Sequence, residues 1–272
     1  MIHIPRKDSG ETILTLPLDT LERASLMGAV LEEADLTAAN LRGADLRHSN
    51  LCKARLAGAD LRDARLQGAD LSAADLTDAD LSGARLVATR LVASTLTRAR
   101  LRRADAMRAT FELATLNGAV LESAVLTRAT LVHATAVASD FTGADLSGAT
   151  LSFSTWRDSV LIHATLAGAV LDGTDLTGCD LSGAELSRAV LAGATLTGAN
   201  LSGAIFGRTV VAACPTLARA VGLEHVVHHA ASRLDIETLI ATLDELPDGF
   251  LDGVGLSQEV RHALRSASPQ AR

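Results

Sequence analysis

Residues 54–83 read ARLAG ADLRD ARLQG ADLSA ADLTD ADLSG, six groups of five with an apolar residue at the centre of each. The same register runs without a slip from Leu21 to Phe206, and 32 of its 38 centres are Leu. Two residues before the centre, Ala fills 29 of the 37 positions from 24 to 204, and small residues fill the rest. The remaining centres are also apolar: Ala106, Phe111, Ala136, Phe141, Trp156 and Phe206.

A period of five excludes both regular secondary structures. On an α-helix five residues advance about 500°, so the centres would spiral around the axis instead of forming a stripe. In one continuous strand side chains alternate with a period of two, so every second centre would face away from the core. The chain must therefore turn within every five residues, with the small residue and the centre inward and three residues outward. Glycine two places after the centre, as at Gly43, Gly58 and Gly83, suits such a turn.

The triplets Ala44-Asp45-Leu46, Ala69-Asp70-Leu71 and Ala144-Asp145-Leu146, set in this five-residue pattern, resemble the pentapeptide-repeat family. The resemblance implies an all-β solenoid, a right-handed quadrilateral β-helix with four pentapeptides per coil. The 38 pentapeptides then make about nine and a half coils, in a rod of roughly 45 Å at about 4.8 Å per coil. Trp156 lies twenty residues after Ala136, so the largest centre is expected to stack on one of the smallest.

Three regions follow from the extent of the repeat. Residues 1–20 are expected to form an N-terminal cap segment and residues 21–206 the β-helix. Residues 207–272 are expected to form a helical C-terminal cap or an interaction tail, because the period of five stops there.

Composition limits the function classes. The chain is 48 % apolar but 2 % aromatic, so Leu, Val and Ala must fill the core. A net charge of −7 argues against a general nucleic-acid binder. Three widely spaced cysteines argue against a disulfide framework and indicate a reducing compartment. We see no signal peptide and no apolar run near twenty residues, and therefore expect a cytoplasmic protein without a membrane span.

Charged residues twenty apart should stack on neighbouring coils. Asp60 and Asp80 would then place two acids together, and we take them as a candidate acidic ladder. Elsewhere opposite charges alternate, which predicts exposed ion pairs along two columns: Asp35, Arg55 and Asp75 in one, and Asp45 with Arg65 and Arg85 with Asp105 in the next.

A basic belt is expected to run around the rod over little more than one coil. Between its first and last arginine the only acid is Asp105. Two interpretations remain open, a solvated surface and a docking band for an acidic partner. The belt comprises Arg85, Arg90, Arg98, Arg100, Arg102, Arg103 and Arg108.

The tail contains helix signals. Asp235 has the properties of an N-cap, and a second helix is expected after Ser257. The segment from Gly222-Leu223-Glu224 through Leu239, and then from Pro247 to Leu256, resembles short tails that follow pentapeptide arrays in bacterial proteins carrying a TIR domain. This resemblance implies an adaptor or a freestanding sensor arm. A cap for the open end of the β-helix and a homodimer interface are the alternatives. The candidate contacts form a stripe at helical spacing: Ile236, Leu239, Ile240 and Leu243.

No catalytic, cofactor or metal site is expected. The string from Asp75 to Gly83 imitates a calcium motif, but Asp75 and Asp80 fall on neighbouring sides of the coil. His225, His228 and His229 lack a matching Cys pair or carboxylate for zinc. Neither a nucleophile elbow nor a phosphate-binding glycine loop occurs outside the repeat.

Two functions therefore compete. One is a non-enzymatic scaffold or adaptor that binds a protein partner. The other is implied by the resemblance, because the pentapeptide-repeat family includes quinolone-resistance and self-protection proteins that bind DNA gyrase as acidic mimics of DNA. Residues 21–206 carry 21 acids and 17 bases, a weak charge for a mimic of duplex DNA.

Overall fold

A β-turn repeated along the chain builds the rod in the computed structural model, which describes residues 1–267. In most repeats the carbonyl of the centre accepts the N–H three residues on, as from Ala44 to Leu41 at 2.9 Å. The residue two after the centre has a positive φ at all 39 positions from 23 to 213, and 24 of these are not glycine. The turn is therefore imposed by the coils on either side and not by glycine alone.

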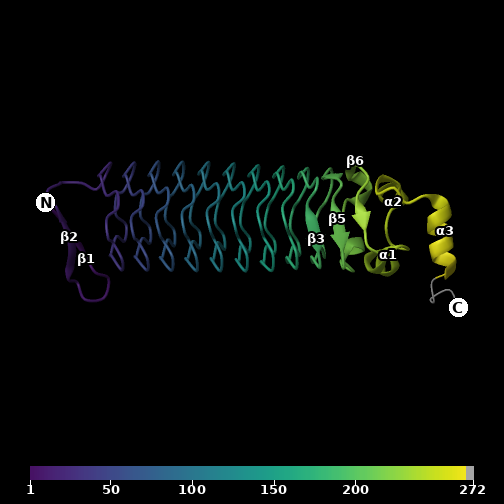
Figure 1. The fold of residues 1–272 in the computed structure, drawn as a ribbon, viewed down its shortest axis with the longest axis horizontal. Coiled ribbons are helices and arrows are strands. Elements are labelled where there is room, and N and C mark those ends of the chain that lie inside the picture. The colour runs from purple at the N-terminus through teal and green to yellow at the C-terminus, as the bar shows by residue number, and fades with distance from the viewer. Residues whose placement is uncertain (268–272) are drawn as a thin grey trace.

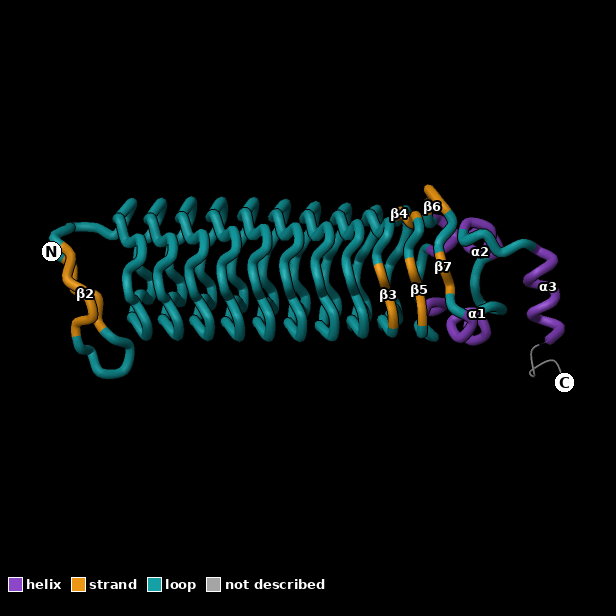
Figure 2. The backbone as a smooth tube through the Cα atoms, viewed as in Figure 1, coloured by secondary structure: helices purple, strands orange, loops and turns teal. Residues whose placement is uncertain are grey.

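Successive coils are joined by parallel bridges between residues twenty apart. Asp35↔Arg55, Asn40↔Asp60, Asp45↔Arg65 and Asn50↔Asp70 supply one bridge to each of the four sides of a coil. The coils stack into a straight rod with a hairpin at one end and helices at the other (Figure 1). Most sides are too short to count as strands, so Figure 2 draws the coils largely as loops.

The core is a column of inward side chains. Every centre from Leu21 to Phe206 is buried, as are the small residues two places earlier except Ala29 and Ala39 in the first coil. Trp156 stacks above Ala136 as expected, since Ala136 N–H bonds to Thr155 O on the next coil. Its ring lies 4.5 Å from that of Phe141 between centroids, and its Nε1 donates to Ser154 Oγ at 2.7 Å.

Hydroxyl groups replace Ala at several inward positions without leaving a polar group unpaired. Ser49 Oγ donates to Leu46 O and Thr89 Oγ1 to Leu66 O, each at 2.7 Å. A buried hydroxyl without a partner would cost about 1–3 kcal/mol, so these bonds explain why Ser and Thr are tolerated in this column.

An antiparallel hairpin covers part of the first coil. It consists of β1 (Ile2–Pro5) and β2 (Thr12–Leu16), and Ile4 is buried. Asp35 N–H bonds to Pro5 O at 2.8 Å, which pairs the hairpin with one side of that coil. The hairpin therefore covers backbone groups at the edge of the first coil that would otherwise be unpaired.

Stacking continues beyond Phe206, the last centre of the strict repeat. β3 (Val190–Ala192), β5 (Val210–Ala212) and β7 (Arg233–Leu234) form one parallel sheet. β4 (Ile205–Gly207) pairs in parallel with β6 (Val227–Ala230). The short 3₁₀ turns η1 (Leu217–Arg219) and η2 (Leu223–His225) insert extra residues, so Val210 pairs with Arg233 rather than with a residue twenty on. Stacking therefore reaches Leu234, which a search for a period of five misses.

Three helices follow: α1 (Ile236–Thr242), α2 (Asp248–Gly253) and α3 (Gln258–Ala267). α1 contacts β5 and η1, and α2 contacts β6 and η2. Leu243, Leu246, Phe250 and Leu251 are buried there, so the first two helices close the end of the core (Figure 1). Among residues 1–267, none of the helices combines the length and the apolar character that crossing a bilayer requires.

Candidate interaction surfaces

The aspartates of the A-D-L triplets have a structural role in the turn. Asp60 Oδ1 accepts Arg62 N–H at 3.1 Å, and Asp80 Oδ1 accepts Ser82 N–H at 3.0 Å. The carboxylate before the centre thus bonds the backbone after it, an Asx-type turn. The frequent Asp one residue before the centre is therefore explained by the fold and does not by itself mark a binding surface.

The acidic ladder is present but partly neutralised. Asp60 and Asp80 bridge each other on adjacent coils, as expected. The Arg62 guanidinium, however, bonds the Asp60 carboxylate through Nε at 2.8 Å and Nη2 at 2.5 Å. These bonds lower the pKa of Asp60 from its ordinary value. Reading columns of residues twenty apart missed Arg62 because it lies across the turn and not along the column.

The expected ion pairs between coils form only in part. Arg65 pairs with Asp45 at 3.5 Å, but Arg47 also binds Asp45, at 2.6 Å. Arg55 pairs with Asp8 of the N-terminal segment at 3.0 Å instead of with Asp35 or Asp75. Within residues 1–267, Arg85 and Asp105 bridge each other through the backbone without an ion pair. Those two expected pairings were wrong, because outward side chains choose partners across turns as well as along columns.

The basic belt is less cationic than its sequence suggests. Asp78 binds Arg98 through two hydrogen bonds of 2.7 Å, and Glu122 pairs with Arg102 at 3.1 Å. Arg90 pairs with Asp70 at 3.5 Å. All three acids lie twenty residues from their arginine and therefore outside residues 85–108, the segment in which Asp105 is the only acid. In the described part of the chain four belt arginines have no carboxylate within 4.0 Å: Arg85, Arg100, Arg103 and Arg108.

A shallow hollow of about 460 Å³ lies within the belt. Its wall spans four successive coils: Arg62 and Asp63 on the first, Ser82 and Gly83 on the second, Arg102 and Arg103 on the third and Glu122 on the fourth. Its charges are mixed, so it offers a partner both a cation and an anion.

The apolar stripe of the tail divides into two halves. Leu239 and Leu243 are buried against the rod, while Ile236 and Ile240 are 60 % and 64 % exposed. Asp235 is the expected N-cap, since its side chain accepts Thr238 N–H at 2.9 Å. Half of the stripe therefore packs in the core, and the other half faces solvent.

Histidines and cysteines could bind a metal ion or act as nucleophiles, but His228, Cys179 and Cys214 lie in packed parts of the fold. In the described range of 1–267, no three His, Cys, Asp or Glu residues are placed to hold a metal ion. His228 packs between Phe206 and Phe250 rather than beside His225 and His229. The cysteines are free thiols, and burial raises the pKa of Cys179 to about 12 and that of Cys214 to about 11. These two thiols stay protonated near neutral pH and are poor nucleophiles.

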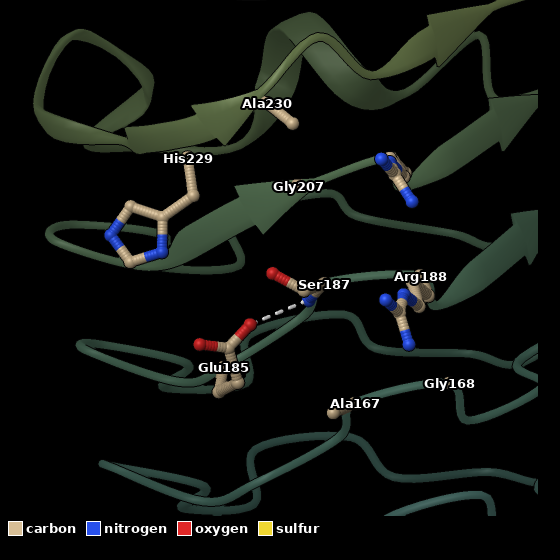
Figure 3. Close-up of a pocket in the computed structure, with 9 residues that line it drawn as sticks. Ala167, Gly168, Glu185, Ser187, Arg188, Gly207, His229 and Ala230 are labelled. Atoms are coloured by element: carbon tan, nitrogen blue, oxygen red, sulfur yellow. Dashed lines mark hydrogen bonds between the residues drawn. The ribbon is translucent and has the colours of Figure 1, made fainter.

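A second hollow, also of about 460 Å³, lies near the C-terminal end of the rod. Figure 3 shows Glu185 and His229 on one side of it and Arg188 on the other. Arg208 lines it from the next coil, and Ser187 lies between. Glu185 is engaged by Ser187 N–H at 2.8 Å, whereas neither arginine has an ion-pair partner among residues 1–267. Sequence reasoning missed this pair because Arg188 and Arg208 are isolated along the chain.

The chain belongs to the pentapeptide-repeat family. The family's model, Pentapeptide repeats, matches in eight copies between residues 20 and 208. Members of this family form right-handed quadrilateral β-helices, the fold class expected from the sequence. They are in general non-enzymatic scaffolds.

Several solved structures are similar. HetL, a pentapeptide repeat protein involved in heterocyst differentiation regulation in the cyanobacterium Nostoc, is 30 % identical, with a TM-score of 0.43 over 76 % of this chain and 91 % of HetL. The plasmid-mediated fluoroquinolone resistance protein QnrB1 is 17 % identical, with a TM-score of 0.43 over 81 % of this chain and 94 % of QnrB1. A pentapeptide repeat protein of the Arabidopsis thaliana thylakoid lumen is 22 % identical, with a TM-score of 0.29 over 53 % of this chain and 85 % of that one. No curated protein matches the chain.

Proposed function

We propose that this chain is a non-enzymatic scaffold that binds a protein partner along its rod. One observation carries the proposal: hydrogen bonds between coils hold the outward side chains in fixed columns, and some cations in these columns are uncompensated. The belt contributes Arg85, Arg100, Arg103 and Arg108 to this uncompensated set. Such charges on a rigid frame favour fast and specific association with an acidic surface.

The scaffold can be tested with photo-crosslinking residues placed on each side of one coil. Ser82, Val87, Val92 and Thr97 occupy equivalent outward positions on its four sides. We expect crosslinks to one protein from one or two neighbouring sides. Added albumin serves as the control for non-specific crosslinking. Equal crosslinking from all four sides, or crosslinking no stronger than that to albumin, would contradict the proposal.

The belt can be tested with matched charge changes. Replacing the unpaired Arg100, Arg103 and Arg108 by Gln should slow association with the crosslinked partner, and salt should reduce the difference. The control replaces three paired arginines, Arg90, Arg98 and Arg102, and changes the net charge equally. If both triples behave alike, the belt is only solvated surface.

The free half of the tail stripe supports a further part of the proposal. Ile236 and Ile240 are large, apolar and exposed on one face of α1. A homodimer through the C-terminal helices would bury them, and an adaptor partner is the alternative. Sedimentation of the parent and of Ile236→Glu separates the two, since only the dimer would dissociate. We also propose a cytoplasmic location, in keeping with three free thiols.

A mimic of DNA directed at gyrase receives less support. Its acidic columns would have to present a continuous negative field. Here Asp45, Asp60 and Asp78 are each bound by an arginine.

A further inference from the structure

Four arginines form one column on an edge of the rod. Arg108, Arg128, Arg188 and Arg208 all lie two residues after a centre, each with a φ between 56° and 61°. None has a carboxylate within ion-pair distance in the described residues 1–267. Arg108 and Arg128 form one pair on adjacent coils, and Arg188 and Arg208 form another. Between these pairs the same column holds Gly148 and Gly168, so two coils without a side chain at this position separate the two pairs of cations.

The columns on either side of this edge contain no acid. The hydrogen bonds from Arg108 to Thr127 O and from Arg188 to Gly207 O identify the column on one side. Parallel bridges from Thr110 to Val170 identify the other. Their members are Met107, Thr127, Ser147, Ala167, Ser187 and Gly207 on the first side, and Thr110, Thr130, Thr150, Val170, Val190 and Val210 on the second.

Two acids beyond the first of these columns accept hydrogen bonds from neutral donors. Asp145 accepts Ser147 N–H at 2.9 Å and Thr127 Oγ1 at 3.0 Å, and Glu185 accepts Ser187 N–H at 2.8 Å. Among residues 1–267 no carboxylate lies within ion-pair distance of these four arginines, although Glu185 lines the same hollow as Arg188 and Arg208. In the belt, by contrast, three arginines are paired.

The edge has a shape as well as a charge. The hollow of about 460 Å³ beside Arg188 and Arg208 is lined by both arginines, and Ser187, His229 and the single acid Glu185 add polar groups to its wall (Figure 3). At the other pair, the Arg128 stem lies over Gly148, with Arg128 Cγ 3.6 Å from the position that a Cβ on this glycine would take.

The spacing fits an extended polypeptide. With about 4.8 Å per coil, the two pairs are separated by about 14 Å and the whole column spans about 24 Å. An extended chain advances about 3.3 Å per residue, so about eight residues cover the column, with acids at both ends. Guanidinium groups bind carboxylates through two parallel hydrogen bonds.

We propose that the edge formed by Arg108, Arg128, Arg188 and Arg208 binds an extended acidic segment of a protein partner. A pair of carboxylates meets each arginine pair, and bulkier residues lie over Gly148 and Gly168. This inference rests on the proposed scaffold function and specifies its partner. Nucleic acid fits less well, because a wider polyanion would also cover Asp145 and Glu185, and neither flanking column holds an aromatic residue to stack on bases.

The test measures fluorescence anisotropy with the full chain and a labelled peptide, Glu-Glu-Ala-Leu-Leu-Ala-Glu-Glu. We expect the peptide to bind, and Arg128→Gln, Arg188→Gln and Arg208→Gln together to raise Kd by at least about tenfold. The matched control changes Arg47, Arg62 and Arg98 to Gln, which removes the same charge from paired arginines, and should alter Kd by less than about twofold. Thermal unfolding of both triples checks that they remain folded.

Three outcomes would contradict the proposal that this edge binds an acidic segment. They are no binding of the peptide, an equal loss of peptide affinity in both triple variants, and equally tight binding of an eight-nucleotide single-stranded DNA. The crosslinking experiment stays independent of these results. The crosslinkers at Ser82, Val87, Val92 and Thr97 could still capture the partner when Arg128, Arg188 and Arg208 are all replaced by Gln. That result would show that the partner does not bind this edge, while the proposed scaffold function would be retained. Absence of every crosslink would instead remove the scaffold itself.

Discussion

The His228 ring lies 5.3 Å from the Phe250 ring between centroids, in an edge-to-face contact that joins the last coil to helix α2. Both ring nitrogens are buried, and neither has a hydrogen-bond partner among residues 1–267. Phe206 contacts the same imidazole at 6.0 Å. The His228 ring thus packs helix α2 against the last coil, and burial in this contact lowers the pKa of the imidazole.

This contact predicts that the cap loosens in mild acid. Burial lowers the pKa of His228, so the undocked tail takes up a proton more readily than the docked one. Docking is then fully stable above the ordinary histidine pKa of about 6.5 and weakens as pH falls below it. The protection of the α1 and α2 amides, taken as the intrinsic exchange rate at each pH divided by the observed rate, should therefore fall as the pH is lowered from about 7 to about 5.

Variants isolate the histidine. His228→Leu removes the titrating group and should abolish that change, while His229→Leu, at an exposed neighbour, should retain it. Equal pH dependence in the parent and in His228→Leu would refute the mechanism.

The core makes a second prediction. Leu126 is a fully buried centre, whereas its neighbour Val125 is 37 % exposed. Leu126→Ala should lower the free energy of unfolding by about 2–5 kcal/mol, and Val125→Ala by less than about 1 kcal/mol. Leu126→Asp should unfold the coil locally, because it buries an unpaired charge. Thermal melting followed by circular dichroism measures all three, and similar losses at both positions would refute the inward assignment.

The positive φ values predict a stabilising substitution. Ala73 has a φ of 56° and is exposed, whereas Ala74 is buried. Ala73→Gly should raise the free energy of unfolding by about 1 kcal/mol, because the left-handed region is unfavourable for residues with a Cβ. Ala74→Gly should lower it, because a buried methyl group is lost. Denaturant unfolding should therefore shift in opposite directions for these adjacent residues.

Gyrase provides the remaining prediction. Purified protein in excess should leave DNA supercoiling by gyrase unchanged, because arginines bind much of the acidic surface. If supercoiling were inhibited, and if Asp60→Asn with Asp80→Asn relieved the inhibition while Asp248→Asn in the tail did not, the mimic would replace the scaffold.

The period of five predicted much of the fold because it reports which residues must face inward. Ala136 under Trp156 is one such prediction, and the structure confirms it. Surface pairing was harder to predict, since Arg98 finds Asp78 on the previous coil and Asp60 finds Arg62 across its own turn. The last coil was missed for a different reason: the residues inserted at η1 and η2 preserve the stacking while breaking the period.

The constant offset of twenty residues between bridged positions separates two properties of the rod. Deleting twenty residues would shorten the rod by one coil and return every later side chain to its original side. Deleting five would keep the core intact but turn all later columns, and the helical cap with them, by a quarter of a revolution. The length of the rod and the rotation of its two ends about the axis can therefore be changed separately. Whole coils of four pentapeptides change only the length. Any pentapeptides left over after whole coils rotate the tail relative to the N-terminal hairpin.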